Sequence, residues 1–198
     1  GSLEPSFEAA FDIVKRFDNI FVNIIVAQNG QIHRPGILRT ARFIQDVARL
    51  SPNGYDNFRV GASCNVSANG PFFPFTYHDG KTGFSLALEL PALFHKILDH
   101  NQGKSLTQLK SALCDALVHE LNEVNSTGLS IEKTTGVRYV GLDSSLAPYP
   151  DDTGSVAALL ERIGGADYGT SGTLFMTAVL TDCLRHAVSI SGVRTVGF

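Results

Sequence analysis

Strand-like and helix-like segments alternate along almost the whole chain, and this alternation most constrains the fold. Short β-branched apolar runs are typical of buried strands, and apolar residues every three or four positions are typical of helices. The strand-like segments lie at 20–27, 58–66, 82–90, 136–145 and 192–198, and the helix-like segments at 4–16, 35–48, 91–98, 105–124, 153–163 and 173–188. Because parallel neighbouring strands need helical crossovers, the pattern predicts an α/β fold with a largely parallel sheet.

One helix is marked with particular clarity. Ser105-Leu106-Thr107-Gln108 is a capping-box pattern, in which Ser and Gln side chains bond reciprocally to free backbone amides. Behind it, apolar residues continue on one face to Val124. This segment predicts a long amphipathic helix with one buried side.

The chain of 198 residues is long enough to bury a real core without disulfides. It contains no internal repeat and no linker-like stretch, so we predict a single α/β domain over residues 1–198. The leading Gly1-Ser2 is typical of a cloning remnant. The last segment, 192–198, begins as a strand and then stops, which suggests a piece of a longer protein.

Charge and apolar content narrow the classes of function. Sixteen Lys and Arg against 19 Asp and Glu give a net charge of −3, which does not favour nucleic-acid binding. No apolar run approaches the roughly 20 residues of a membrane-spanning helix, and no secretory leader opens the chain. The three cysteines, Cys64, Cys114 and Cys183, form no C-x-x-C pair, so neither a disulfide framework nor a thiolate zinc site is indicated. We therefore expect a cytoplasmic protein with no membrane or nucleic-acid partner.

Several predicted strands carry small or polar residues on one side. Alternate strand residues point to opposite faces, so Phe58, Val60, Ala62 and Cys64 form one set, and Arg59, Gly61, Ser63 and Asn65 the other. The sequence predicts that the apolar set is the buried one, with Cys64 an inert buried thiol. Gly83, Ser85, Ala87 and Glu89 form a similar polar set in the next strand.

Asn65, Glu89 and Asp143 all fall near the carboxyl ends of predicted strands. Parallel α/β sheets bind ligands at that edge, so these residues predict a polar pocket, with Ser145 beside it as a ligand-binding residue. Glu89 and Asp143 are candidates for acid–base catalysis or for ligating a divalent cation such as magnesium or calcium. Structural carboxylates or helix caps are the alternative interpretation.

Two loops carry further candidate residues. His78, next to Asp79 in an unusual Pro- and Phe-rich segment, is a candidate acid–base catalyst because an imidazole titrates near neutral pH; a surface histidine is the alternative. Gly169, Thr170, Gly172 and Thr173 precede a predicted helix, where backbone amides can hold an anion. Simple N-capping explains the same residues.

Several long motifs together resemble one known family. They occur in the order Asp56-Asn57-Phe58-Arg59, Pro71-Phe72-Phe73-Pro74, Phe84-Ser85-Leu86-Ala87-Leu88-Glu89, Gly141-Leu142-Asp143-Ser144-Ser145-Leu146-Ala147-Pro148 and Gly169-Thr170-Ser171-Gly172-Thr173-Leu174. The chain resembles domain-of-unknown-function family 711, also called uncharacterised protein family 0210, over nearly all residues after about Asp18.

The resemblance implies part of an α/β barrel related to pyruvate formate-lyase, in a family of longer proteins without an established activity. The glycyl-radical loop and paired catalytic cysteines of pyruvate formate-lyases are not visible in this sequence, so radical chemistry is not implied. A partial barrel would leave strand edges open, which predicts a homo-oligomer.

Two functions follow as hypotheses. One is an enzyme, or a former enzyme, that binds a small polar or anionic metabolite in the carboxylate-lined pocket. The other is a non-catalytic interaction or assembly module that oligomerises through sheet edges. Changing Asp143→Asn or Glu89→Gln distinguishes them, because only the first hypothesis predicts a lost ligand with little loss of folding.

Overall fold

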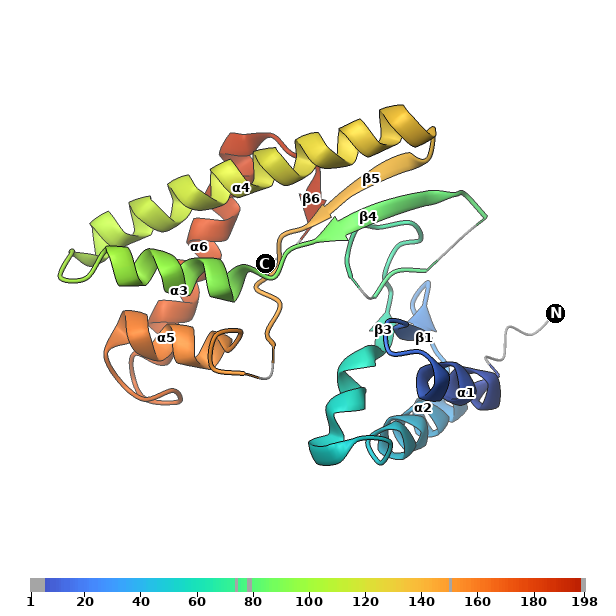
Figure 1. The fold of residues 1–198 in the computed structure, drawn as a ribbon. Coiled ribbons are helices and arrows are strands. Elements are labelled where there is room, and N and C mark those ends of the chain that lie inside the picture. Colours follow the sequence, from blue (N-terminus) through green and yellow to red (C-terminus); the bar gives the residue numbers. More distant parts are fainter. Residues whose placement is uncertain (1–5, 74, 78–79, 150, 197–198) are drawn as a thin grey trace. The chain divides into compact units, whose positions relative to one another are not determined.

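The computed structural model describes residues 6–73, 75–77, 80–149 and 151–196 (Figure 1). Helices and strands alternate, which confirms the predicted mixed α/β class. The chain forms two compact units, Gly1–Lys81 and Thr82–Phe198, and each is described by itself. The single domain expected from the sequence stays a prediction.

The first unit contains one small mixed sheet and its helices. Its elements are α1 (Phe7–Arg16), β1 (Val22–Gln28), β2 (Gln31–Ile32), α2 (Arg34–Val47), the 3-10 helix η1 (Pro52–Arg59) and β3 (Val60–Cys64). The strand order is β2-β1-β3, with β1 antiparallel to β2 and parallel to β3. The tight β1–β2 turn has Asn29 and Gly30 at positive φ, a conformation that Asn and Gly adopt most readily.

A buried arginine holds the first unit together. Arg59 is 6% exposed, and its guanidinium donates to the backbone carbonyls of Val14, at 2.8 Å, and of Phe17 and Ile20. It also pairs with the carboxylate of Asp56, which accepts from Nε at 3.0 Å. One side chain thereby ties the end of α1 to the segment that leads into β3.

The buried face of β3 is the reverse of the one predicted. Gly61 and Ser63 are buried, while Ala62 and Cys64 are exposed. A Cβ on Gly61 would lie 2.6 Å from the Phe75 ring, so the small residue makes room for an aromatic side chain. The prediction of a buried Cys64 was therefore wrong, because alternation alone does not reveal which side of a strand faces the interior.

The second unit contains an entirely parallel sheet. Its elements are β4 (Gly83–Ala87), α3 (Leu90–His100), α4 (Leu106–Thr135), β5 (Arg138–Asp143), α5 (Val156–Gly164), α6 (Thr173–Ser191) and β6 (Thr195–Val196). The order is β4-β5-β6, with both pairs parallel. Helices α3 and α4 connect the first pair and α5 and α6 the second, which are the crossovers predicted from the alternation.

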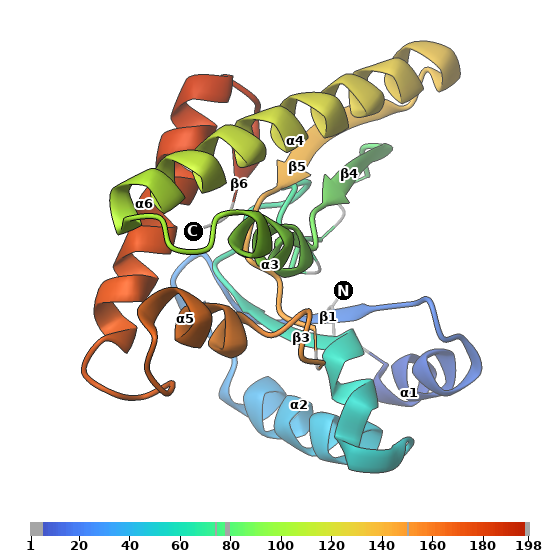
Figure 2. The same cartoon turned by 60° about the vertical axis from the view of Figure 1, so that its left-hand side comes forward.

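The capping box that predicts α4 is present. Ser105 Oγ accepts from the Gln108 amide at 3.4 Å, and the Gln108 side chain accepts from the Ser105 amide at 3.0 Å. The helix ends at Gly136, which has the left-handed conformation (φ 72°) favoured at helix C-termini. The chain then reverses into β5, and α4 runs alongside that strand in both views (Figures 1 and 2).

The core of the second unit lies where α3, α4, α5 and α6 pack together and against β5. Its largest fully buried side chains include Phe94 of α3, Leu117 of α4, Leu142 of β5, Leu159 of α5 and Leu180 of α6.

Neither sheet closes into a barrel within the described residues, so the barrel implied by the resemblance is not seen. No helix in the described part of the chain is both long and apolar enough to cross a membrane.

Candidate functional site

The carboxyl edge of the parallel sheet brings together two of the carboxylates singled out from the sequence. Asp143 is the last residue of β5 and pairs in register with Ala87, the last residue of β4. Glu89 follows β4 by two residues, forms an isolated antiparallel bridge with Leu146 and stands at the N-cap of α3. Both carboxylates therefore belong to the same edge, as the parallel arrangement predicts.

Asp143 organises the turn that leaves β5. Its side chain is buried at 4% exposure, and Oδ1 accepts from the Ser145 amide at 2.9 Å and from the Ser145 hydroxyl at 2.6 Å. Ser145 is thus engaged by Asp143. These contacts support the interpretation of Asp143 as a structural carboxylate, since a carboxylate that is hydrogen-bonded in this way stabilises a local turn.

Ser144 attaches the last strand to this edge. Its amide and its hydroxyl both donate to the Val196 carbonyl at 2.8 Å, and Thr195 Oγ1 donates to Ser144 Oγ at 2.9 Å. The carboxyl edge is therefore a connected polar layer that reaches from β5 to β6.

A small cavity opens beside Glu89. Its volume is about 170 Å³, and it is lined by Glu89, Pro91, Ala92, Ala147, Tyr149, Asp151, Thr153 and Gly154. Two segments form it: the start of α3 and the loop between β5 and α5. The Glu89 side chain makes no capping hydrogen bond to its helix and no hydrogen bond or ion pair with another described residue.

Asp151 also lines this cavity. Its Oδ1 accepts from the Gly154 amide at 2.6 Å and from the Thr153 hydroxyl at 2.9 Å. These hydrogen bonds, the Gly154 amide first, hold the pKa of the Asp151 carboxyl below its usual value. The negative form is favoured because both donors stabilise charge on the oxygen.

Other candidate residues belong to other elements of the fold or lie outside the described residues. Asn65 belongs to the first unit, where β3 pairs with β1 rather than with β4; its side chain accepts from the Gly30 amide at 3.1 Å and supports the β1–β2 turn. The strands before Asn65 and Glu89 therefore belong to different sheets, and the condition that they are neighbours, under which all three residues would share one edge, is not met. His78 lies outside the described residues.

The loop predicted to bind an anion lies at the end of α5 farther from β5 (Figures 1 and 2). The Gly169 amide donates to Thr173 Oγ1 at 2.9 Å, the Thr170 amide to the Asp167 carbonyl, and the Thr173 amide to the Thr170 carbonyl. Gly172 is the N-cap of α6. Three of the loop amides therefore donate to acceptors within the same segment rather than to an anion. This geometry supports the alternative interpretation, in which the loop only caps the helix.

Among the described residues, no group of three or more His, Cys, Asp or Glu side chains is arranged to hold a metal ion. Glu89 and Asp143 alone would supply too few protein ligands for a closed site, although magnesium retains several waters and needs only one or two carboxylates. The cation site stays a prediction.

Neither Tyr149 nor Asp151 is among the candidate residues drawn from the sequence. In the structure Ser155 caps α5, accepting from the Ala158 amide at 3.1 Å. The available signal was Asp151-Asp152-Thr153-Gly154, since Asp followed by Thr and Gly is typical of a side-chain-stabilised turn.

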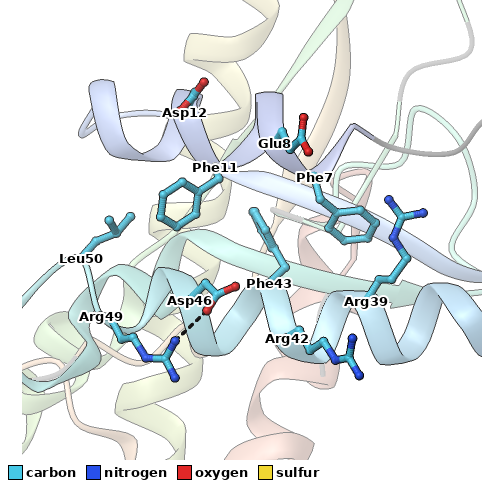
Figure 3. A pocket seen from close by; sticks show the side chains of 10 residues that line it. All are labelled: Phe7, Glu8, Phe11, Asp12, Arg39, Arg42, Phe43, Asp46, Arg49 and Leu50. Atoms are coloured by element: carbon cyan, nitrogen blue, oxygen red, sulfur yellow. Dashed lines mark hydrogen bonds and ion pairs between the residues drawn. The ribbon is translucent and has the colours of Figure 1, made fainter.

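A second, larger pocket was also missed. It has a volume of about 600 Å³ and lies between α1 and α2 of the first unit (Figure 3). Phe7, Phe11 and Phe43 lie between the two helices, and the Arg39 guanidinium sits 4.7 Å from the centre of the Phe7 ring. Arg49 pairs with Asp46 at 2.8 Å at the rim. This pocket is an open apolar groove with mixed charge around it.

Comparison with known proteins places the chain in a family. Residues 4–198 match the family described as Uncharacterised ACR (DUF711). The chain belongs to the DUF711 family. This confirms the resemblance inferred from the motifs, and DUF711 is a family whose description states no activity.

Curated relatives of this DUF711 chain are each called UPF0210 protein. Those of Pyrobaculum islandicum and Pyrobaculum arsenaticum are both 27% identical, over 76% and 89% of the chain, and that of Neisseria gonorrhoeae is 25% identical over 72%. The matches cover 34%, 39% and 32% of those relatives. The chain thus spans about a third of the length of the relatives it matches.

Proposed function

We propose that this protein binds a small polar metabolite in the cavity between Glu89 and Asp151. The observation that carries the proposal is the Glu89 carboxylate, which lines a cavity at the carboxyl edge of a parallel sheet and makes no capping bond. Ligands of α/β sheets bind outside this edge, where loops and helix N-termini converge.

The charge of the lining selects among polar ligands. Glu89 and Asp151 are the charged side chains in the described lining, so the cavity favours hydroxyl or ammonium groups. An anionic metabolite would need a magnesium or calcium ion between it and the carboxylates. The volume of about 170 Å³ suits a small ligand or one group of a larger ligand.

If the protein is an enzyme, Glu89 is the residue to exchange a proton with the ligand, because its carboxylate borders the cavity. Asp143 would then act as a positioning residue, through Ser145 and the turn after β5. General acid–base work requires a carboxyl group within hydrogen-bonding reach of the reacting atom, and Glu89 meets that condition for a ligand in the cavity.

Native mass spectrometry of the purified chain tests this proposal, together with calorimetric titration of magnesium and calcium. We expect a retained mass or a cation-binding signal that Glu89→Gln abolishes without changing the free energy of unfolding. Asp152→Asn is the matched control, because Asp152 is exposed and does not line the cavity. A bare wild-type mass with no cation binding, or an equal loss in both variants, would refute the proposal.

A second candidate function is assembly. Leu174 and Phe175, at the start of α6, are 81% and 57% exposed, and large adjacent apolar side chains in water favour an interface. We propose a homo-oligomer as the rival role. Light scattering during gel filtration should then show an oligomer that dissociates in Leu174→Asp; a monomeric wild-type chain would exclude it.

The barrel kinship is also a proposal. Strands β4, β5 and β6 are parallel, adjacent in chain order and joined by helices, which is the arrangement of consecutive barrel strands. This supports a segment of a pyruvate-formate-lyase-like barrel in the longer relatives. We also propose the cytoplasmic location that the sequence predicts.

A further inference from the structure

Two cysteines that are 69 positions apart meet in the core of the second unit. Cys114 of α4 and Cys183 of α6 are 5% and 0% exposed, and their sulfur atoms are 2.9 Å apart. Both are free thiols. A disulfide bond is roughly 2.05 Å long, so bond formation requires the two sulfur atoms to move closer by less than about 1 Å.

The packing of the two helices produces this contact. Cys114 lies in the buried stripe of α4 with Leu113 and Leu117, and Cys183 lies beside Leu180 and Leu184 on α6. At the helix surface, Lys110 and Asp182 form an ion pair next to the cysteines. The pair is therefore shielded by apolar side chains and covered by a salt bridge.

The surroundings of Cys183 disfavour its thiolate. Burial, and then the contact with Cys114, raises the pKa of the Cys183 thiol well above its ordinary value. Because the thiolate is the reactive form, Cys183 is a poor nucleophile at rest, and burial keeps bulky thiol reagents away from both cysteines. A small oxidant that enters during brief separation of α4 and α6 meets two sulfur atoms already in place.

We propose that Cys114 and Cys183 form a reversible disulfide that locks α4 to α6 when the protein meets a small hydroperoxide. The peroxide oxidises one thiol to a sulfenic acid, and water leaves with the second peroxide oxygen. The other sulfur atom then attacks the sulfenic sulfur, the S–S bond forms, and a second water carries away the hydroxyl group and the thiol proton. Two electrons pass from the cysteines to the peroxide, and a dithiol reductant returns them.

The test uses the full chain with Cys64→Ser, since Cys64 is exposed and would react separately. After treatment with hydrogen peroxide, the protein is unfolded and its thiols are alkylated. We expect the alkylated cysteines to fall from two to none, to return after dithiothreitol, and a linked peptide pair containing Cys114 and Cys183 to appear in a non-reducing digest. The thermal midpoint of the second unit should rise by about 5 °C or more, because the bond closes a long loop.

A second variant separates cross-linking from other oxidation. Adding Cys183→Ala leaves Cys114 alone, and peroxide should then give no linked peptides and no rise in the midpoint. The proposal is overturned if both thiols of the Cys64→Ser chain stay alkylatable, or if they are lost in a form that dithiothreitol does not restore. The experiment on Cys64→Ser decides the matter even if Cys183→Ala fails to fold.

Discussion

Gly128 of α4 faces the ring of Tyr139 on β5. A Cβ at this position would lie 2.6 Å from the ring, closer than real side-chain contacts. Gly128→Ala gains about 1 kcal/mol of helix propensity, but overpacking costs about 1–3 kcal/mol. We expect a net loss of stability of about 1 kcal/mol, measured by urea unfolding.

A second substitution provides the control. In a Tyr139→Leu background the ring is absent, so Gly128→Ala should become neutral or stabilising. The same destabilisation in both backgrounds would show that the ring is not the cause.

The placement of the site's carboxylates could be predicted from the sequence, but their individual roles could not. Glu89 and Asp143 occur at strand ends, and strand periodicity predicts that placement. Their different surroundings depend on partners that periodicity does not specify: Asp143 is engaged by Ser145, whereas Glu89 borders a cavity with Tyr149. Asn65 follows a strand that pairs in the other sheet, and strand periodicity does not specify which strands pair.

The ion pair of Asp56 and Arg59 connects α1, η1 and β3, and its strength should depend on pH. The hydrogen bond from Arg59 lowers the pKa of the Asp56 carboxyl. A carboxyl with a lowered folded-state pKa stabilises the fold above its unfolded-state pKa of about 4, and this stabilisation is lost as the pH falls through the folded value. Asp56→Asn should cost about 2 kcal/mol at pH 7, and the difference from wild type should narrow below about pH 4.

Asp46 supplies the matched comparison, since it pairs with Arg49 at the same spacing but on the surface. Exposed pairs contribute about 0–1 kcal/mol, so Asp46→Asn should change little at any pH. Urea unfolding of the three proteins between pH 3 and pH 7 measures both effects. A constant difference between wild type and Asp56→Asn across this range would contradict the prediction.

Elements with strong local signals were predictable. The capping box of α4 was found where Ser105 and Gln108 predict it, but the helix continues to Thr135, beyond the predicted end. Its last turns carry exposed Leu129 and Ile131 and no continuous apolar stripe, so the periodic signal fades before the helix ends. The two-residue strand β2 is too short to produce any periodic signal, whereas β6 lies within the segment 192–198 that was predicted to be a strand.

The described residues of each unit form a buried core of their own, and the two cores differ in size. In the described part of the chain, five residues form the buried cluster of the first unit and 17 form that of the second. Hydrophobic burial supplies most of the folding free energy. We therefore expect two thermal transitions, with the amides of the first unit losing protection from hydrogen exchange at the lower one.

A fragment covering residues 82–198 should retain only the upper transition. Calorimetry of the full chain and of this fragment, with hydrogen exchange to assign each transition, is the measurement. One cooperative transition that involves both units would disprove this independence.

Contacts between helices that are far apart along the chain could not be predicted from the sequence. Cys114 and Cys183 meet only because α4 and α6 pack against each other, and their separation along the chain carries no sign of it. The groove between α1 and α2 was missed for the same reason, since Phe7 and Phe43 are brought together by helix packing. Local patterns specify elements, whereas pairings among elements depend on the complete core.

The bonds of Arg59 also bear on the order of events during synthesis. The carbonyls of Val14 and Ile20 accept from a side chain that lies 45 and 39 residues later in the chain. Ribosomes add roughly 5–20 residues per second, so the end of α1 is exposed for seconds before its partner has been made. The end of α1 therefore cannot form these hydrogen bonds until Arg59 has been synthesised. The first unit completes its fold only after the segment before β3 has been made.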